Sequence, residues 1–257
     1  MPRNFKIILA YDGHDFAGWQ VQPDRVTIQG ALVSAIEQLT GERTLPQGSG
    51  RTDAGVHALA QVASVEIASP IPVANLRKAL NDLLPESIRI LDVQEVPPDF
   101  HARKSAIAKT YEYRIYRGEI CPPFLARYVC HHPFPLDEAQ MAAAASAAIG
   151  EHDFTSFAAV DPETRKEGLE INNVRTIYSS AWQHRGEEFV YTVRGSGFLH
   201  HMVRNLVGTF LMIGKGNLTV HDFRRILDAR DRSAAAATAP ASGLFLVSVE
   251  YEGEKPL

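Results

Sequence analysis

The residues with the clearest chemical potential lie in one glycine-rich segment, residues 48–58, which reads GSGRTDAGVHA. Its three glycines allow tight backbone turns and let a ligand approach the main chain closely. Asp53 is its only carboxylate. The spacing of a P-loop, GxxxxGK followed by Ser or Thr, is missing. Two interpretations of Asp53 therefore stay open from this segment alone: a catalytic carboxylate, or a turn-forming residue bonded to its own backbone.

A second candidate is Arg204, the only charged residue in the stretch Phe198–Ile213. This stretch is apolar nearly all round, which predicts a buried helix. A buried guanidinium without a partner is strongly destabilising, so Arg204 needs a carboxylate from elsewhere in the fold. Few acids lie in apolar or glycine-rich surroundings, and Asp53 is the best candidate. The alternative is an ion pair that serves the structure alone.

Tyr111 is a third candidate. The stretch 109–116 alternates in polarity and predicts a strand with Tyr111, Tyr113 and Ile115 on one face. An aromatic ring among basic side chains can stack on an extruded nucleobase while nearby phosphates are neutralised. Core packing is the alternative, and we favour it for Tyr113. The basic residues around this strand are Arg103, Lys104, Lys109, Arg114 and Arg117.

The cysteines and histidines do not indicate a metal centre. Zinc needs four convergent ligands, and the consecutive residues Cys130, His131 and His132 cannot all point at one ion. Cys121 and Cys130 fit neither a CxxC pair nor a disulfide framework. No catalytic triad is readable from the spacing of the histidines, which we interpret as polar or core-edge residues: His57, His131, His132, His200 and His201.

Composition places the chain among ordinary globular proteins. It has 257 residues, 45% of them apolar and 22% charged, which excludes disordered and fibrous classes. No apolar run reaches the roughly 18 residues of a membrane span, and the first residues lack the pattern of a signal peptide. We therefore expect a cytoplasmic protein. The net charge of −4 excludes a protein that coats nucleic acid through overall positive charge, but not a local basic face.

The charges are unevenly distributed along the chain. Residues 189–221 contain no aspartate or glutamate, whereas Arg194, Arg204 and Lys215 lie among them. Acidic residues gather instead in residues 82–99 and 151–170. A one-sided basic face is one interpretation, and charges scattered by folding are the other.

Two similar runs of elements must position these residues. Hydrophobic periodicity predicts the order β-α-β-β-α-β in the first run, and a similar order in the second. The first has strands at 5–11, 42–47, 61–67 and 88–96 and helices at 27–39 and 73–84. The second has strands at 109–116, 174–182, 188–194 and 244–251 and helices at 137–149, 198–213 and 219–229. Residues 161–170 and 232–242 are expected to be mobile loops.

The predicted fold class is α+β. We expect two split-βαβ, ferredoxin-like halves with antiparallel or mixed sheets and an active-site cleft between them. The predicted domains are residues 1–105, which carry the Asp53 segment, and residues 106–257, which carry Tyr111 and Arg204.

Motifs along the whole chain resemble the TruA family of tRNA pseudouridine synthases. The Asp53 motif is the most specific of them, and all occur in the family's order. They are YDGxxFxGWQ at 11–20 followed by TIQG at 27–30, GRTDAGVH at 50–57, KTYEY at 109–113, GFLHHMVRNxVG at 197–208 and APASGL at 239–244.

The resemblance implies an isomerase that converts uridine to pseudouridine in the anticodon stem-loop, at tRNA positions 38, 39 and 40. It makes Asp53 the catalytic aspartate and Arg51 the arginine that helps to extrude the target nucleotide. Tyr111 would stack on the base, Arg204 would pair with the aspartate, and Leu244 would form the apolar wall of the pocket. The family implies no cofactor and no metal, and a homodimer whose two subunits both contact tRNA in a basic cleft.

The residues themselves suit this reaction. Breaking the N1–C1′ bond of uridine and rejoining the base through C5 needs neither redox chemistry nor hydrolysis. An ionised Asp53 could attack the sugar carbon or act as a base at the ribose, and a nearby Arg204 would favour the ionised form. Two other classes stay open: a non-catalytic RNA-binding module or chaperone on the same scaffold, and a sugar- or phosphate-processing enzyme, which lacks a second carboxylate at readable spacing.

Overall fold

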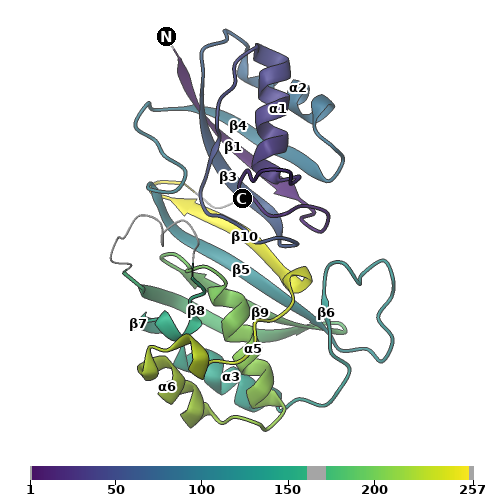
Figure 1. Ribbon diagram of the computed structural model, residues 1–257, viewed down its shortest axis with the longest axis vertical. Helices are drawn as coiled ribbons and strands as arrows, with labels where there is room; N and C mark the ends of the chain where they lie inside the picture. Colours follow the sequence, from purple (N-terminus) through teal and green to yellow (C-terminus); the bar gives the residue numbers. More distant parts are fainter. Residues whose placement is uncertain (1, 161–171, 255–257) are drawn as a thin grey trace. The chain divides into compact units, whose positions relative to one another are not determined.

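The computed structural model describes residues 2–160 and 172–254. Strands and helices are intermixed throughout, which confirms the predicted α+β class (Figure 1). The chain divides into two compact units, Met1–Lys109 with Phe245–Leu257, and Thr110–Leu244. The last strand thus belongs to the first unit. The predicted division into domains 1–105 and 106–257 stays a proposal, because a compact unit need not fold by itself.

The first unit is a sheet with strand order β4-β1-β3-β10, accompanied by two helices (Figure 1). Strand β1 is antiparallel to both β3 and β4, whereas β10 runs parallel to β3. Helices α1 and α2 pack against each other, and α2 packs on β4. The elements are β1 (Arg3–Tyr11), α1 (Ile28–Thr40), β2 (Gln47–Gly48), β3 (His57–Ile67), α2 (Val73–Leu83), β4 (Ile88–Val96) and β10 (Leu244–Tyr251).

The ends of α1 show how local sequence sets an element. The Thr27 hydroxyl accepts a hydrogen bond from the Gly30 backbone N–H at 3.2 Å, which caps the first turn. Gly41 follows the last turn with a φ of 76° and donates its N–H to the Glu37 carbonyl. Glycine adopts this left-handed conformation without strain. Both predicted ends of the helix are therefore confirmed.

The second unit has the strand order β5-β9-β8-β7. Strand β8 is antiparallel to β7 and β9, and the short β6 pairs in parallel with β5. Helix α3 packs against α5, α6 and β8. The elements are β5 (Ala106–Tyr116), β6 (Cys130–His131), α3 (Glu138–Ala147), β7 (Gly150–Asp153), β8 (Val174–Arg185), β9 (Glu188–Gly195), α5 (Met202–Gly214) and α6 (Val220–Ala229), with 3-10 turns η1 (Thr155–Phe157), η2 (Arg232–Ala234) and η3 (Ala241–Gly243).

Several predicted boundaries are wrong for identifiable reasons. The strand expected at 42–47 is reduced to β2, a two-residue pairing with β3. Strand β3 begins at His57, four residues before the predicted start, because pairing with β1 and β10 extends it. Helix α5 begins at Met202 rather than Phe198, because His201 has a φ of 59°. Strand β7 was not predicted at all.

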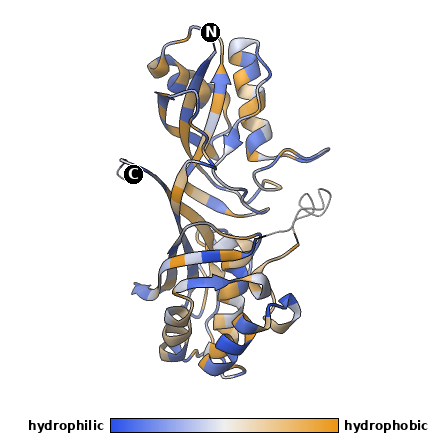
Figure 2. Cartoon of the chain, turned by 90° about the vertical axis from the view of Figure 1, so that its left-hand side faces the viewer, coloured by the Kyte–Doolittle hydropathy of each residue, from blue (hydrophilic) through white to orange (hydrophobic). Residues whose placement is uncertain are grey.

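Apolar residues recur along the helices and strands of both units (Figure 2). The two hydrophobic cores differ in the side chains that form them. Phe5, Ile7 and Leu9 of β1 are completely buried in the first unit. The second unit has an aromatic core in which the Phe210 ring lies 5.3 Å from Tyr191 and 5.4 Å from Phe223, centroid to centroid. Within residues 2–160 and 172–254, no helix is long and apolar enough to cross a membrane.

Candidate active site

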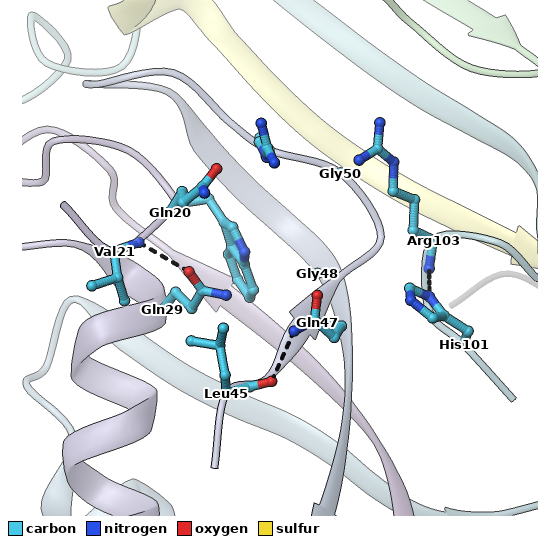
Figure 3. A pocket seen from close by; sticks show the side chains of 11 residues that line it. Gln20, Val21, Gln29, Leu45, Gln47, Gly48, Gly50, His101 and Arg103 are labelled. Atoms are coloured by element: carbon cyan, nitrogen blue, oxygen red, sulfur yellow. Dashed lines mark hydrogen bonds between the residues drawn. The ribbon is translucent and has the colours of Figure 1, made fainter. Parts of the chain in front are cut away.

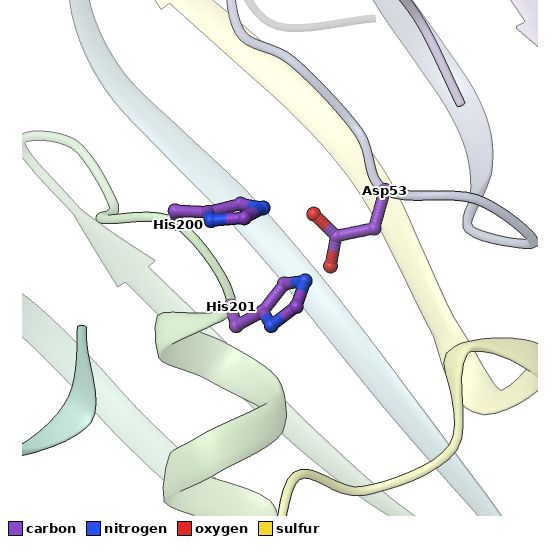
Figure 4. A group of neighbouring side chains, drawn as sticks. All are labelled: Asp53, His200 and His201. Atoms are coloured by element: carbon purple, nitrogen blue, oxygen red, sulfur yellow. The ribbon is translucent and has the colours of Figure 1, made fainter. Parts of the chain in front are cut away.

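Asp53 lies in the loop between β2 and β3, residues 49–56, which we call the Asp53 loop (Figure 4). Its side chain is half-buried. The Val56 N–H donates to the Asp53 carbonyl at 3.1 Å, and Gly55, with a φ of 78°, donates its N–H to the Phe16 carbonyl. A tight turn that needs glycine thus follows the carboxylate directly.

A buried hydroxyl pair anchors the residue before Asp53. The Tyr11 hydroxyl and the Thr52 hydroxyl are 2.8 Å apart, and the Trp19 N–H donates to the Thr52 carbonyl at 3.0 Å. Tyr11 is only 4% exposed. Burial raises the pKa of Tyr11 to about 12, so its proton remains available for hydrogen bonding at neutral pH.

The start of the Asp53 loop is held by one buried glutamine of β3. The Gln61 amide donates to the Gly50 carbonyl at 3.0 Å and accepts from the Ser49 hydroxyl at 2.7 Å. The Ser49 carbonyl in turn accepts a hydrogen bond from the Lys109 ammonium group. Gln61 is completely buried. The loop is therefore fixed to the sheet on the side that precedes the aspartate.

The motif at residues 11–20 forms the floor of the Asp53 loop. A Cβ atom on Gly18 would lie 2.6 Å from the Thr52 carbonyl oxygen, and one on Gly13 would lie 1.9 Å from the Val56 carbonyl oxygen. Only glycine allows so close a backbone approach. These glycines explain why this motif accompanies the aspartate motif in the sequence.

Two residues near Asp53, Arg51 in the loop and His57 at the start of β3, differ in exposure. Arg51 is exposed. His57 is 1% exposed, and its ring stacks on Phe245 at a centroid distance of 4.7 Å. Its Nδ1 atom lies 3.1 Å from the Gly13 backbone nitrogen. His57 is thus a packed core residue, in agreement with the sequence interpretation of the histidines.

Tyr111 and Tyr113, two of the three tyrosines of β5, have different surroundings. Tyr111 is 8% exposed and lies edge-on to Phe198, with ring centroids 5.0 Å apart and an angle of 77° between the planes. Tyr113 is completely buried and donates its hydroxyl to the Pro240 carbonyl at 2.9 Å. Burial raises the pKa of Tyr113. The core interpretation of Tyr113 is confirmed.

Arg204 lies on α5, whose other residues are almost all buried. The arginine itself is half-buried, so the expected full burial is wrong for this side chain. Its Nε donates to the Ala239 carbonyl at 2.8 Å. Together with the bond from Tyr113 to Pro240, this contact holds the segment that leads to Leu244, the buried first residue of β10.

Sequence reasoning missed Asn205, which organises the chain after α6. Asn205 is completely buried, donates to the Phe157 carbonyl at 2.7 Å, and accepts from Arg232 at 3.0 Å and Thr238 at 2.7 Å. The expectation of a mobile loop at 232–242 is therefore wrong. The sequence signal for this role was a carboxamide, Asn205, in an otherwise apolar helix. A buried carboxamide needs hydrogen-bond partners. The other expected loop, 161–170, lies outside the described residues.

The structure describes the predicted site residues in two groups. Arg51 and Asp53 share a loop of the first unit, and Tyr111, Arg204 and Leu244 belong to the second. The Asp53–Arg204 pair and the cleft remain predictions. Beside Arg204 in the sequence, the His200 and His201 rings lie 4.0 Å apart, centroid to centroid (Figure 4).

Comparisons with known proteins agree on one family. A family model described as tRNA pseudouridine synthase matches residues 7–103 and 144–252. A tRNA pseudouridine synthase A from Solibacter usitatus is 57% identical over 249 residues, covering 97% of this chain and 100% of the relative. One from Latilactobacillus sakei is 43% identical over 255 residues, covering 98% and 100%. A solved archaeal box H/ACA sRNP Nop10-Cbf5 complex has 13% identity and a TM-score of 0.31, covering 89% of this chain and 59% of that one, and adds nothing to the assignment.

Proposed function

Because this chain belongs to the tRNA pseudouridine synthase family, we propose that it isomerises uridine to pseudouridine in the anticodon stem-loop of tRNA. The observation that carries the proposal is the fixed geometry of the Asp53 loop. Before the carboxylate, the Thr52 hydroxyl bonds to buried Tyr11 and the Gly50 carbonyl accepts from buried Gln61. After it, the Gly55 N–H donates to the Phe16 carbonyl. A catalytic group held in place before the substrate arrives lowers the barrier without reorganisation.

The reaction balances without any added reagent. The N1–C1′ bond of uridine breaks, a C5–C1′ bond forms, the hydrogen on C5 leaves as a proton, and N1 gains one. Asp53 acts in its ionised form, as a nucleophile at C1′ or as a base at the ribose. Both roles need a carboxylate, and Asp53 supplies the only one in its loop.

The other site residues take the roles that their motifs imply. Arg51, exposed beside Asp53, helps to extrude the target nucleotide. Tyr111 stacks on the base, and the edge-on contact with Phe198 supports a fixed ring orientation for this role. Arg204 supplies the positive charge opposite Asp53, and Leu244 forms an apolar wall. We also propose a cytoplasmic homodimer that needs no cofactor.

The test uses a tRNA transcript with tritium at C5 of its uridines. Each turnover releases one tritium to water, so the wild-type protein is expected to release it in proportion to the pseudouridine formed. Asp53→Asn keeps the shape of the side chain and removes its charge. We expect this variant to bind tRNA and to release no tritium above background.

The matched control is Asp82→Asn, which removes an exposed carboxylate from α2 of the same unit. It is expected to behave as the wild type does. A wild-type protein that binds tRNA without releasing tritium would favour the RNA-binding alternative. Turnover by Asp53→Asn at more than a trace would remove Asp53 from the catalytic role.

A further inference from the structure

We propose that a pocket in the first unit binds a backbone phosphate of the tRNA outside the target nucleotide. The proposal rests on the proposed function and adds a binding site to it. The pocket has a volume of about 290 Å³, and His101 and Arg103 form part of its wall (Figure 3). Arg51, two residues before Asp53, also lines it. This volume is at the lower end for small-molecule sites, and suits a single nucleotide unit.

The charged side chains that line the pocket favour the binding of an anion. Arg51, His101 and Arg103 line the pocket, and none of its described lining residues is an aspartate or glutamate. An adjacent hollow shares Leu45, Gln47 and His101 with it but also contains Glu66 and Asp99. Local positive charge without opposing carboxylates attracts phosphate, although the whole chain is acidic. The first hollow therefore suits an RNA backbone and the second does not.

The turn that carries Arg103 is fixed by hydrogen bonds. The His101 Nδ1 atom accepts from the Arg103 N–H at 3.1 Å, and the Ser105 N–H donates to the His101 carbonyl at 2.9 Å. Ala102 is bonded on both sides, through its N–H to the Ser64 hydroxyl and through its carbonyl to the Tyr251 hydroxyl. The backbone of Arg103 is thus ordered before RNA arrives.

The same turn gives the pocket a second donor. Nδ1 of His101 accepts a hydrogen bond from the Arg103 backbone N–H, so Nε2 is the ring atom that can donate to a phosphate oxygen. The His101 ring and the Arg103 guanidinium, on one turn, match the several acceptor oxygens of a phosphodiester.

The rest of the lining combines apolar side chains with amide groups. Val21 and Leu45 are 47% and 53% exposed, so they offer apolar surface to a ribose. The Gln29 amide accepts from the Val21 N–H at 2.9 Å (Figure 3). It also donates to the Pro46 carbonyl at 2.9 Å, and Gln20 and Gln47 line the pocket as well. The cationic side chains thus suit the phosphate, and the apolar ones suit the sugar.

The first experiment compares Arg103→Gln with Arg43→Gln. Arg43 is a matched control, since its side chain is 79% exposed in the same unit and does not line the pocket. The affinity for a fluorescent anticodon stem-loop is measured over a range of salt. We expect Arg103→Gln to weaken binding roughly tenfold and to lower the slope of log affinity against log salt by about 0.7–0.9. Equal slopes in the two variants would overturn the proposal.

A second pair separates the pocket from general surface charge. Leu45→Asp places a carboxylate at the rim, and Leu45→Asn has nearly the same shape without charge. Leu45 is 53% exposed, so both variants are expected to fold, which circular dichroism checks. We expect Leu45→Asp to bind RNA several-fold more weakly than Leu45→Asn. Equal affinities would contradict an anion in this pocket.

Ethylation interference identifies the phosphate. In the wild type we expect one ethylated phosphate, outside the target nucleotide, to reduce binding, and that interference should disappear in Arg103→Gln. Interference that is identical in both proteins would overturn the assignment. Tritium release by the wild type is measured in parallel, so an inactive protein points to failure of the proposed function and not of this site.

Discussion

Tyr11 is a buried residue that we expect to position Asp53 without touching the substrate. It lies at the end of β1 and bonds to Thr52, the residue before Asp53. We expect Tyr11→Phe to lower kcat about tenfold and to leave KM for tRNA nearly unchanged, because the aspartate would be less well fixed while the RNA-binding surface stays intact. Single-turnover and steady-state tritium release measure both constants.

Tyr191→Phe is the matched control for this prediction. Tyr191 is completely buried in the second unit, and its hydroxyl lies 2.8 Å from the Ser180 hydroxyl. Each variant leaves one buried hydroxyl without its partner, which costs about 1–3 kcal/mol of stability. If both variants lose activity in proportion to stability, Tyr11 has only a structural role.

At the scale of elements, α6 offers a test of its N-terminal cap. The Thr219 hydroxyl accepts from the Asp222 N–H at 3.2 Å, and the Asp222 carboxylate accepts from the Thr219 N–H at 2.9 Å. The Thr219 N–H and the Thr219 hydroxyl, which donates to the same carboxylate at 2.8 Å, lower the pKa of Asp222 below its ordinary value of 3.8. We expect Thr219→Ala to destabilise the protein by about 1 kcal/mol at neutral pH.

The pH dependence of this cap has a definite sign. A carboxyl whose pKa is lower in the folded protein stabilises it above the ordinary value of 3.8, and the contribution disappears as the pH falls through the folded value. Urea unfolding between neutral pH and about pH 3 should therefore bring wild type and Thr219→Ala closer together. A constant difference would show that Asp222 is not linked to the cap.

Elements defined by local signals were predictable, and those defined by distant partners were not. The caps at Thr27, Asp137 and Thr219 follow from side chains that bond within their own turn. Strand β7 is four residues long and depends on pairing with β8, which no local pattern reveals. The late start of α5 depends on the left-handed conformation of His201, which is uncommon for any residue other than glycine and is not predicted by an apolar helical pattern.

The candidate site was predictable to a similar extent. Asp53 was found because its loop is rich in glycine and its motif is specific. The groups that fix this loop, Tyr11 and Gln61, come from strands β1 and β3, where alternating patterns indicate burial but not a hydrogen-bond partner. The hydrogen-bond partner of a polar side chain inside a strand can be identified only when the register of the sheet is known.

At the scale of the whole molecule, the proposed Asp53–Arg204 pair joins two units. The double variant Asp53→Asn with Arg204→Met should lose less stability than the sum of the single variants, by about 1–2 kcal/mol. Denaturant unfolding of the four proteins measures this coupling. Asp82→Asn with Arg204→Met is the control and should be additive. Additivity in both cycles would show that Asp53 and Arg204 do not interact.

The return of β10 to the first unit has a consequence for synthesis on the ribosome. Strand β3, which follows the Asp53 loop, gains its parallel neighbour only when residues 245–251 have been made. Until then His57 and Ala58 at the start of β3 lack their partners Phe245 and Leu246, and an unpaired strand edge is a template for mispairing with other chains. The sheet of the first unit is therefore completed only at the end of translation, although most of this unit is translated first. We expect chaperones to engage it while the second unit is translated.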